Sequence, residues 1–203
     1  MSSEYSILCN SENVILSFAS DGLLIDKFEQ KFEFLNYLSS EYKNKADLYF
    51  FMDKQKEWYH KGITGISTSI LETRQYLVQL IQKGNYKRII CIGYSSGGYA
   101  ALLFGSILKA NLIITFNAQT LLNSCNNKKY SDILPYINRK TSIILYTDSK
   151  IKRKKNYHHH SQSRRILIYK NAKVIEKPSL NVNNYLLTNE ITPIINSYLN
   201  KEE

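Results

Sequence analysis

Ser95 is the residue of this sequence with the best local setting for a nucleophile. Gly93-Tyr94-Ser95-Ser96-Gly97 gives the pattern G-x-S-x-G between an apolar run, RIICIG, and an Ala/Leu-rich run, GGYAALLFG. A strand that turns abruptly into a helix crowds the residues two before and two after its central residue, and glycine relieves that crowding. The central residue then presents its hydroxyl, while the first helical N–H groups, including that of Ser96, face a developing oxyanion. The pattern predicts a nucleophilic serine.

The turn has three other interpretations. Ser95 suits the central position better than Ser96, because the residue two before Ser96 is Tyr94, which does not relieve the crowding. A Rossmann phosphate loop is disfavoured because Ser95 replaces its second glycine and the segment is not the first strand–helix unit. A structural turn without chemistry remains an open alternative.

The elements that hold this turn follow from the hydrophobic pattern. Short apolar runs predict strands at residues 5–9, 13–19, 46–52, 87–93, 111–117, 141–147 and 164–170, and 174–176 is expected to extend the sheet. Longer runs with helical spacing predict helices at 28–42, 64–82, 97–108 and 191–199. Alternating strands and helices indicate a three-layer α/β/α sandwich with a mostly parallel sheet. The first two strands, joined by a short turn, are expected to form an antiparallel hairpin at one edge.

Length and composition indicate one domain over residues 1–203. The chain has 203 residues, of which 43% are hydrophobic and 22% charged, which is ordinary for a globular α/β protein. No segment is long and apolar enough to span a membrane, and the N-terminal stretch lacks the basic region of a signal peptide. Cys9, Cys91 and Cys125 form no CxxC pattern, so buried free thiols are expected rather than disulfides or a zinc site. A cytoplasmic location is therefore expected.

The net charge of +10 favours anionic partners. Basic residues gather between Lys150 and Arg165, as either a binding surface or a solvated loop. Nucleic acid is a disfavoured partner, since the sequence has no basic recognition helix, RNP-like strand or zinc finger.

Three stretches together resemble a known superfamily. VILSFAS is similar to the early strand of α/β-hydrolases, whose following loop lends an oxyanion-hole N–H, here near Phe18 and Ala19. MDKQKEWYHKG and CIGYSSGGYAALLFG resemble, more closely, segments of small hydrolase-fold proteins encoded with bacterial capsule and surface-polysaccharide genes. The resemblance covers roughly the first 120 residues. It implies an α/β-hydrolase-like fold and an esterase or O-acyltransferase acting on sugars, with a Ser, Asp, His triad in that chain order.

The base of that triad is not where the resemblance places it. The family's histidine is expected near residues 179–181, and this chain has no histidine after His160. The favoured substitutes are His159 and His160, and His60 is a second choice. His158, His159 and His160 lie in the loop between the strands predicted at 141–147 and 164–170. The alternatives are a solvent-exposed histidine run and, least favoured, a weak metal site. Losing the base costs on the order of 10⁶ in turnover, so a catalytically inactive binding protein also stays open.

The third triad member is expected to be Asp148, which follows the strand at 141–147 and comes after the serine. A turn or helix-capping aspartate is the alternative for Asp148. Asp132 is second, and Asp53 is expected to shape the pocket. Trp58 and Tyr59 either stack on a sugar ring or simply pack, packing being the default.

These predictions combine into one expected activity. Ser95 would form an acyl-enzyme and pass the acyl group to water or to a hydroxyl of a carbohydrate, for which a bacterial surface polysaccharide is favoured. No cofactor is expected, apart from an acyl-CoA donor if the protein is a transferase. The alternative is a catalytically impaired hydrolase-fold protein that binds carbohydrate or a partner protein.

Overall fold

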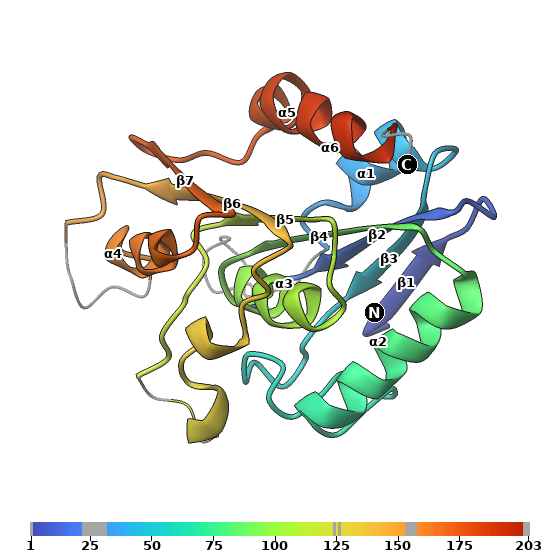
Figure 1. Ribbon diagram of the computed structural model, residues 1–203, viewed down its shortest axis with the longest axis horizontal. Coiled ribbons are helices and arrows are strands. Elements are labelled where there is room, and N and C mark those ends of the chain that lie inside the picture. Colours follow the sequence, from blue (N-terminus) through green and yellow to red (C-terminus); the bar gives the residue numbers. More distant parts are fainter. Residues whose placement is uncertain (1, 22–31, 124, 126, 153–157, 201–203) are drawn as a thin grey trace.

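The computed structural model describes residues 2–21, 32–123, 125, 127–152 and 158–200 (Figure 1). Seven strands form a single sheet in the order β1-β3-β2-β4-β5-β6-β7. Every neighbouring pair is parallel except β1 and β3. The strands are β1 (Glu4–Ile7), β2 (Asn13–Phe18), β3 (Asp47–Phe51), β4 (Arg88–Tyr94), β5 (Leu112–Phe116), β6 (Ser142–Asp148) and β7 (Ala172–Lys177).

Helices cover both faces of the sheet, which confirms the three-layer prediction (Figure 1). On one face lie α2 (Ile70–Gly84) and α3 (Ser95–Ile107), and on the other lie α1 (Leu35–Tyr42) and α6 (Thr192–Leu199). The shorter elements are α4 (Ser161–Arg164), α5 (Asn184–Leu186), η1 (Lys128–Tyr130), η2 (Leu134–Tyr136), η3 (Arg165–Ile168) and the π-helical turn η4 (Leu187–Ile191).

The edge pair is antiparallel as expected, but the predicted hairpin between the first two strands is wrong. β1 pairs with β3, and β2 lies between β3 and β4. β2 contains consecutive fully buried residues, including Val14, Ile15 and Leu16, which need protein on both faces and therefore a central place in the sheet. β1 has exposed side chains, such as Tyr5, and suits an edge.

Three other boundaries differ from the sequence prediction. The strand predicted at 164–170 is instead the end of α4 and η3, and the sheet ends with β7. Within this run Ile166 is buried in the core layer under α3, whereas the two residues after it, Leu167 and Ile168, are exposed. α1 begins at Leu35, and the part of its predicted range before residue 32 lies outside the described residues. α2 begins at Ile70 because the Ser69 side chain accepts a hydrogen bond from Glu72 N–H and caps the helix there.

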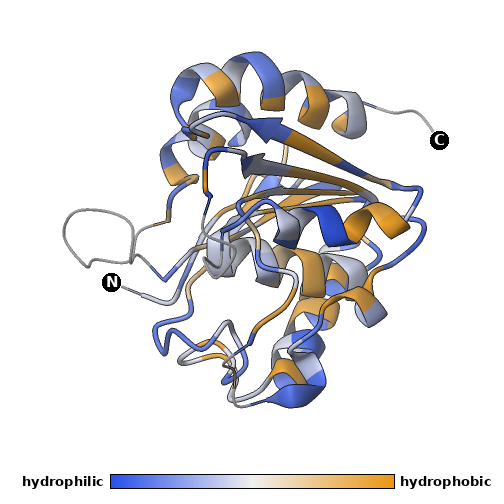
Figure 2. Cartoon of the chain, turned by 90° about the vertical axis from the view of Figure 1, so that its left-hand side faces the viewer, coloured by the Kyte–Doolittle hydropathy of each residue, from blue (hydrophilic) through white to orange (hydrophobic). Residues whose placement is uncertain are grey.

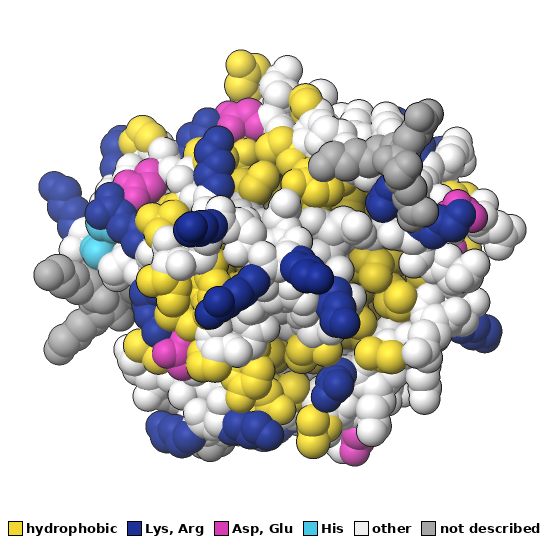
Figure 3. All heavy atoms as spheres, viewed as in Figure 1, with side chains coloured by type: hydrophobic (Ala, Val, Ile, Leu, Met, Phe, Trp, Pro, Cys, Tyr) yellow, Lys and Arg dark blue, Asp and Glu magenta, His cyan; other side chains and the backbone are white. Residues whose placement is uncertain are grey.

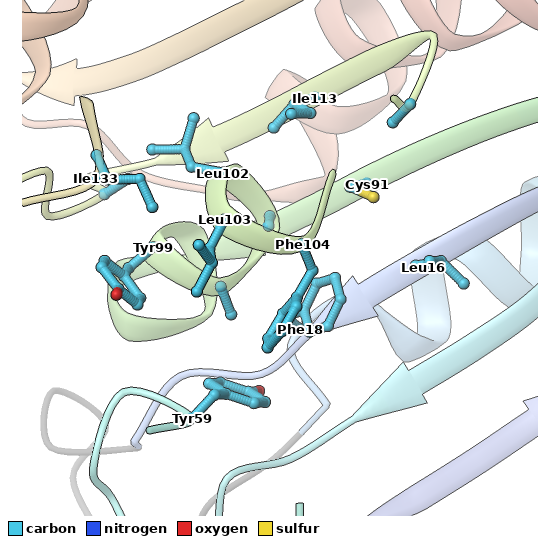
Figure 4. Close-up of a cluster of buried hydrophobic side chains, with 14 of the residues drawn as sticks. Leu16, Phe18, Tyr59, Cys91, Tyr99, Leu102, Leu103, Phe104, Ile113 and Ile133 are labelled. Atoms are coloured by element: carbon cyan, nitrogen blue, oxygen red, sulfur yellow. The ribbon is translucent and has the colours of Figure 1, made fainter. Parts of the chain in front are cut away.

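Two apolar layers hold the sandwich together. Alternate residues of β2 point to opposite faces, so Leu16 packs beneath α3 whereas Ile15 packs beneath α1 and α6. Figure 2 shows the hydrophobic strands enclosed between helices that are polar on their outer sides. In the layer under α3, the rings of Phe18, Tyr59 and Phe104 pack together (Figure 4), with Phe18 stacked on Phe104 at a centroid distance of 5.7 Å. This layer fixes α3, and with it Ser95, against the central strands.

Candidate active site

The turn between β4 and α3 has the strained geometry that the glycine–serine pattern predicts. Ser95 is the first residue of α3, and its φ of 53° lies in the left-handed region. A Cβ on Gly93 would lie 2.2 Å from the carbonyl oxygen of Gly97, and a Cβ on Gly97 would lie 2.0 Å from the carbonyl oxygen of Phe18. Both glycines are therefore required for the helix to start so close to β2 and β4, at the carboxyl ends of the parallel strands.

His158 is the histidine that lies against the serine. Its Nε2 is 2.8 Å from Ser95 Oγ, which is hydrogen-bonding distance. Ser95 is only 4% exposed, so this contact is sheltered from bulk water. Burial lowers the pKa of His158 below its usual 6.5, while the charge of Asp21 acts in the opposite direction. A neutral imidazole is thereby favoured near neutral pH, which is the form that accepts a proton.

The sequence had favoured His159 and His160, and the structure gives these residues other surroundings. His159 is buried, and its Nδ1 lies 2.8 Å from Ser161 Oγ. The His160 ring packs on that of His159, with centroids 4.1 Å apart. His60 lies 2.9 Å from the hydroxyl of Tyr99 through its Nε2. The histidine in contact with Ser95 thus comes from the loop that the sequence favoured, but it is His158 and not His159 or His160.

The predicted oxyanion donors Phe18 and Ala19 are already engaged. Phe18 is the last residue of β2 and is paired on both sides, with Phe51 and Gly93. The Ala19 N–H donates to the carbonyl of Phe51 at 2.8 Å. Neither amide is free for a substrate oxygen. By contrast, Ser96 N–H belongs to the first turn of α3, where amides have no intrahelical acceptor and carry the positive end of the helix dipole.

The two residues that follow Ala19 are also hydrogen-bonded through their backbone. The Ser20 N–H donates to Glu33 Oε1 at 2.9 Å, and the Asp21 N–H donates to Ser96 Oγ at 3.0 Å. Burial raises the pKa of the Glu33 carboxyl group. The Ser96 side chain thus fixes the loop after β2 against the turn that carries Ser95, and the Asp21 carboxylate lies close enough to influence His158 electrostatically.

Gln119 is a site residue that the sequence analysis missed. Its Nε2 lies 3.3 Å from Ser95 Oγ, and the residue is 3% exposed. It follows β5 by three positions, at the same carboxyl edge of the sheet as Ser95. The available signal was a polar residue directly after a buried strand, which is where ligands gather in such sheets.

The three candidate carboxylates accept hydrogen bonds from nearby backbone N–H groups or from an arginine. Asp148 Oδ1 accepts hydrogen bonds from the N–H groups of Lys150 at 2.8 Å and Ser179 at 3.1 Å. Asp132 forms an ion pair with Arg165 at 2.6 Å. Asp53 accepts from several backbone N–H groups of the following turn, among them that of Tyr59 at 2.8 Å. Asp53 therefore shapes the segment that carries Tyr59.

The aromatic pair Trp58 and Tyr59 packs into the protein. Tyr59 is fully buried, and its hydroxyl lies 2.8 Å from the carbonyl oxygen of Ala19. Burial raises its pKa well above the usual value. Trp58 is half-buried and packs against the same core layer. Tyr59 thus supports the loop after β2 rather than stacking on a sugar ring.

The basic segment between Lys150 and Arg165 is only partly described, because residues 153–157 lie outside the described ranges. Arg164 binds Glu176 through two nitrogen–oxygen contacts, and Arg165 pairs with Asp132. Figure 3 shows Lys and Arg side chains distributed over one face of the protein rather than gathered in a single patch. On this face the positive charge is therefore spread over the surface.

Among the helices that the structure describes, none is long and apolar enough to cross a membrane.

No protein-family model and no curated protein sequence matches this chain. Solved structures do match over nearly its whole length. A capsule O-acetyltransferase of Neisseria meningitidis serogroup A, solved as a variant in complex with CoA, aligns with a TM-score of 0.64 at 14% identity, covering 98% of this chain and 92% of that chain. An α/β-hydrolase enzyme from a Medee basin deep-sea metagenome library gives 0.61 at 11% identity, with 98% and 95% covered. A monoacylglycerol lipase from Paleococcus ferrophilus gives 0.59 at 10%, with 97% of each chain covered.

These similarities, at such low identity, establish the fold: the chain has the α/β-hydrolase fold. The mostly parallel sheet with one antiparallel edge strand, and the sharp turn after β4, agree with that assignment. The matching structures include enzymes that transfer or hydrolyse acyl esters.

Proposed function

We propose that this protein is a serine-dependent acyl-ester enzyme in which Ser95 is the nucleophile and His158 is the general base. The observation that carries the proposal is the 2.8 Å contact between Ser95 Oγ and His158 Nε2 at the start of α3. A nucleophile and base at hydrogen-bonding distance, next to unpaired helical N–H groups, are the parts that acyl transfer requires.

The reaction proceeds in two displacements. Ser95 Oγ attacks the acyl carbonyl carbon while its proton passes to His158 Nε2, and the carbonyl oxygen becomes an oxyanion stabilised by the Ser96 N–H. The intermediate collapses as the bond to the leaving group breaks, and His158 returns the proton to that group. An acceptor hydroxyl, deprotonated by His158, then attacks the acyl-Ser95 ester, and collapse restores the Ser95 hydroxyl.

Stabilisation of the His158 imidazolium is assigned to Asp21. Its negative charge raises the pKa of His158, opposing the effect of burial. Asp148, the acid expected from the sequence, directs Oδ1 to the N–H groups of Lys150 and Ser179, which suits the turn role considered as its alternative. The acid would thus come from the loop after β2, at the same edge of the sheet.

The proposed substrate class is an O-acylated carbohydrate or a carbohydrate hydroxyl that receives an acyl group. Its support is the sequence resemblance to capsule-associated hydrolase-fold proteins and the structural similarity to a capsule O-acetyltransferase. That similar protein was solved with CoA, and a net charge of +10 suits an anionic donor of this kind. If the reaction is transfer rather than hydrolysis, the donor proposed here is an acyl-CoA thioester.

A fluorophosphonate probe tests the nucleophile directly. We expect covalent labelling of the unmodified protein and its loss in Ser95→Ala. Ser106→Ala is the matched control, because Ser106 is a buried serine of the same helix with no hydrogen-bond partner for its hydroxyl among the described residues. An unlabelled but folded wild-type protein would favour the non-catalytic binding module instead.

A second measurement separates transfer from hydrolysis. Thiol release from acetyl-CoA is followed with and without an added polysaccharide acceptor. Acceptor-dependent release, lost in Ser95→Ala, indicates transfer. Release of acetate from an O-acetylated polysaccharide without CoA indicates an esterase.

A further inference from the structure

The loop after β2 was expected to complete the oxyanion hole, but every backbone N–H of its described part, from Ala19 to Asp21, already donates a hydrogen bond within the protein. The N–H groups of Ala19, Ser20 and Asp21 donate to Phe51 O, Glu33 Oε1 and Ser96 Oγ respectively, at 2.8 to 3.0 Å. The Ser96 N–H alone is a single hydrogen-bond donor for a developing oxyanion, which is more stable with two. Among the described residues, a second donor has to come from another element that reaches Ser95.

Gln119 is the side-chain amide that reaches the nucleophile. Its Nε2 lies 3.3 Å from Ser95 Oγ, and the residue is 97% buried, being 3% exposed. The serine hydroxyl has one proton, which it donates to His158 Nε2 when that imidazole acts as the base. Gln119 must therefore donate to Oγ rather than accept from it, which directs Nε2 and not Oε1 toward the reacting atom.

The oxygen of the same side-chain amide lacks a hydrogen-bond partner within the described part of the chain. Gln119 Oε1 is buried and has no hydrogen-bond partner among the residues that the structure describes. A buried polar atom without a partner is costly, so such atoms are rare outside places where a ligand supplies the missing bond. The unpaired oxygen on a side chain that touches the nucleophile indicates that this amide is set for a bound substrate.

We infer that Gln119 is a catalytic residue, and that its Nε2 is the second oxyanion donor, opposite the N–H of Ser96. The inference rests on the proposed function. When Ser95 Oγ bonds to the acyl carbon, Oγ and the oxyanion become substituents of the same atom. A donor that contacts Oγ in the free protein then needs only a small rotation to bond the oxyanion, whose charge makes it the stronger acceptor.

The test uses Gln119→Met, which keeps the side-chain length and removes both amide groups. With an aryl acetate substrate, kcat and kcat/KM are expected to fall together by about a hundredfold or more, with little change in KM, because the donated bond forms only in the transition state. The rate of fluorophosphonate labelling should fall in parallel. Gln119→Asn, which withdraws the donor by one methylene, provides the same test if Gln119→Met does not fold.

The matched control is Thr115→Val. Thr115 is a fully buried residue of β5 whose hydroxyl has no partner among the described residues, and valine has nearly its shape. Its kcat should stay at the wild-type value. A folded Gln119 variant with wild-type kcat, beside an inactive Ser95→Ala, overturns this inference and leaves the proposed function standing. A wild-type protein that neither reacts with the probe nor cleaves the ester overturns both.

Discussion

The close approach of α3 to the centre of the sheet can be tested by adding a single methyl group at Gly97. In Gly97→Ala the new Cβ would lie 2.0 Å from the carbonyl oxygen of Phe18, whereas real Cβ contacts stay above 3.0 Å, so something must move by about 1 Å. Phe18 is held by strand pairing with Phe51 and Gly93. The start of α3 is therefore the part that moves, and it carries Ser95.

The displacement acts on the contact with His158. Moving Ser95 by about 1 Å is enough to break a hydrogen bond of 2.8 Å, and a misplacement of this size costs about 10² in rate. The overpacking itself costs about 1–3 kcal/mol of folding stability. The gain in helix propensity from glycine to alanine returns about 1 kcal/mol at most. We expect a folded protein with a lower melting temperature and at least about a hundredfold lower activity.

The assay is the rate of fluorophosphonate labelling at Ser95, measured beside thermal unfolding. Gly105→Ala is the control on the same helix, because there the nearest atoms are Cδ1 and Cγ1 of the Ile113 side chain, both at 2.8 Å, and not backbone atoms beside Ser95. The labelling rate of Gly105→Ala should stay near wild type. If Gly97→Ala labels at the wild-type rate, the steric argument for the turn is refuted.

Four further predictions concern groups around Ser95 and the loop after β2. His158→Ala should lower kcat by a factor on the order of 10⁶, since Ser95 loses its base, whereas His160→Ala should retain activity. The measurement is the steady-state hydrolysis of an aryl acetate. The reverse pattern would identify His160, which the sequence favoured, as the base. Because burial lowers the pKa of His158, the midpoint of the fall of kcat/KM on the acid side should lie below the usual histidine pKa of 6.5. Asp21→Asn removes a charge that raises this pKa and should shift the acid limb to still lower pH; a shift upward would contradict the assignment. Burial raises the pKa of Glu33, so its ionisation costs stability as pH rises through the folded-state pKa. Glu33→Gln keeps the oxygen that accepts the hydrogen bond from Ser20 and should raise the melting temperature at neutral pH. The difference in melting temperature should disappear below pH 4.5, where the glutamate is also neutral. An unchanged or lower melting temperature at neutral pH contradicts this prediction.

The nucleophile turn was predictable because its requirements are local. Glycines two residues before and after Ser95 are demanded by contacts within a few residues of the turn or with the strand beside it, and they are written in consecutive positions. The buried strands themselves, though not their order in the sheet, were equally readable from unbroken apolar runs such as that of β4. By contrast, the run at 164–170 has the apolar content of a strand yet forms helical turns, in which Ile166 is buried, Leu167 and Ile168 are exposed, and Arg165 pairs with Asp132.

The residues around the nucleophile depend on contacts between distant parts of the chain. His158 is 63 positions from Ser95, and Gln119 is 24 positions away. No spacing in the sequence distinguishes His158 from His159 or His160, since the direction of a side chain in a loop is set by the backbone turn that carries it. The same holds for Ala19, whose N–H is consumed by Phe51 through the parallel pairing of β2 with β3.

The sequence by itself determined the layered α/β architecture and the position of Ser95 at a strained strand–helix turn. Both depend on apolar periodicity and on steric limits within a few neighbouring residues. Only the tertiary structure decided which histidine meets Ser95, which amides face it and where β1 pairs. Those contacts join segments whose separation along the chain carries no information about their distance in space.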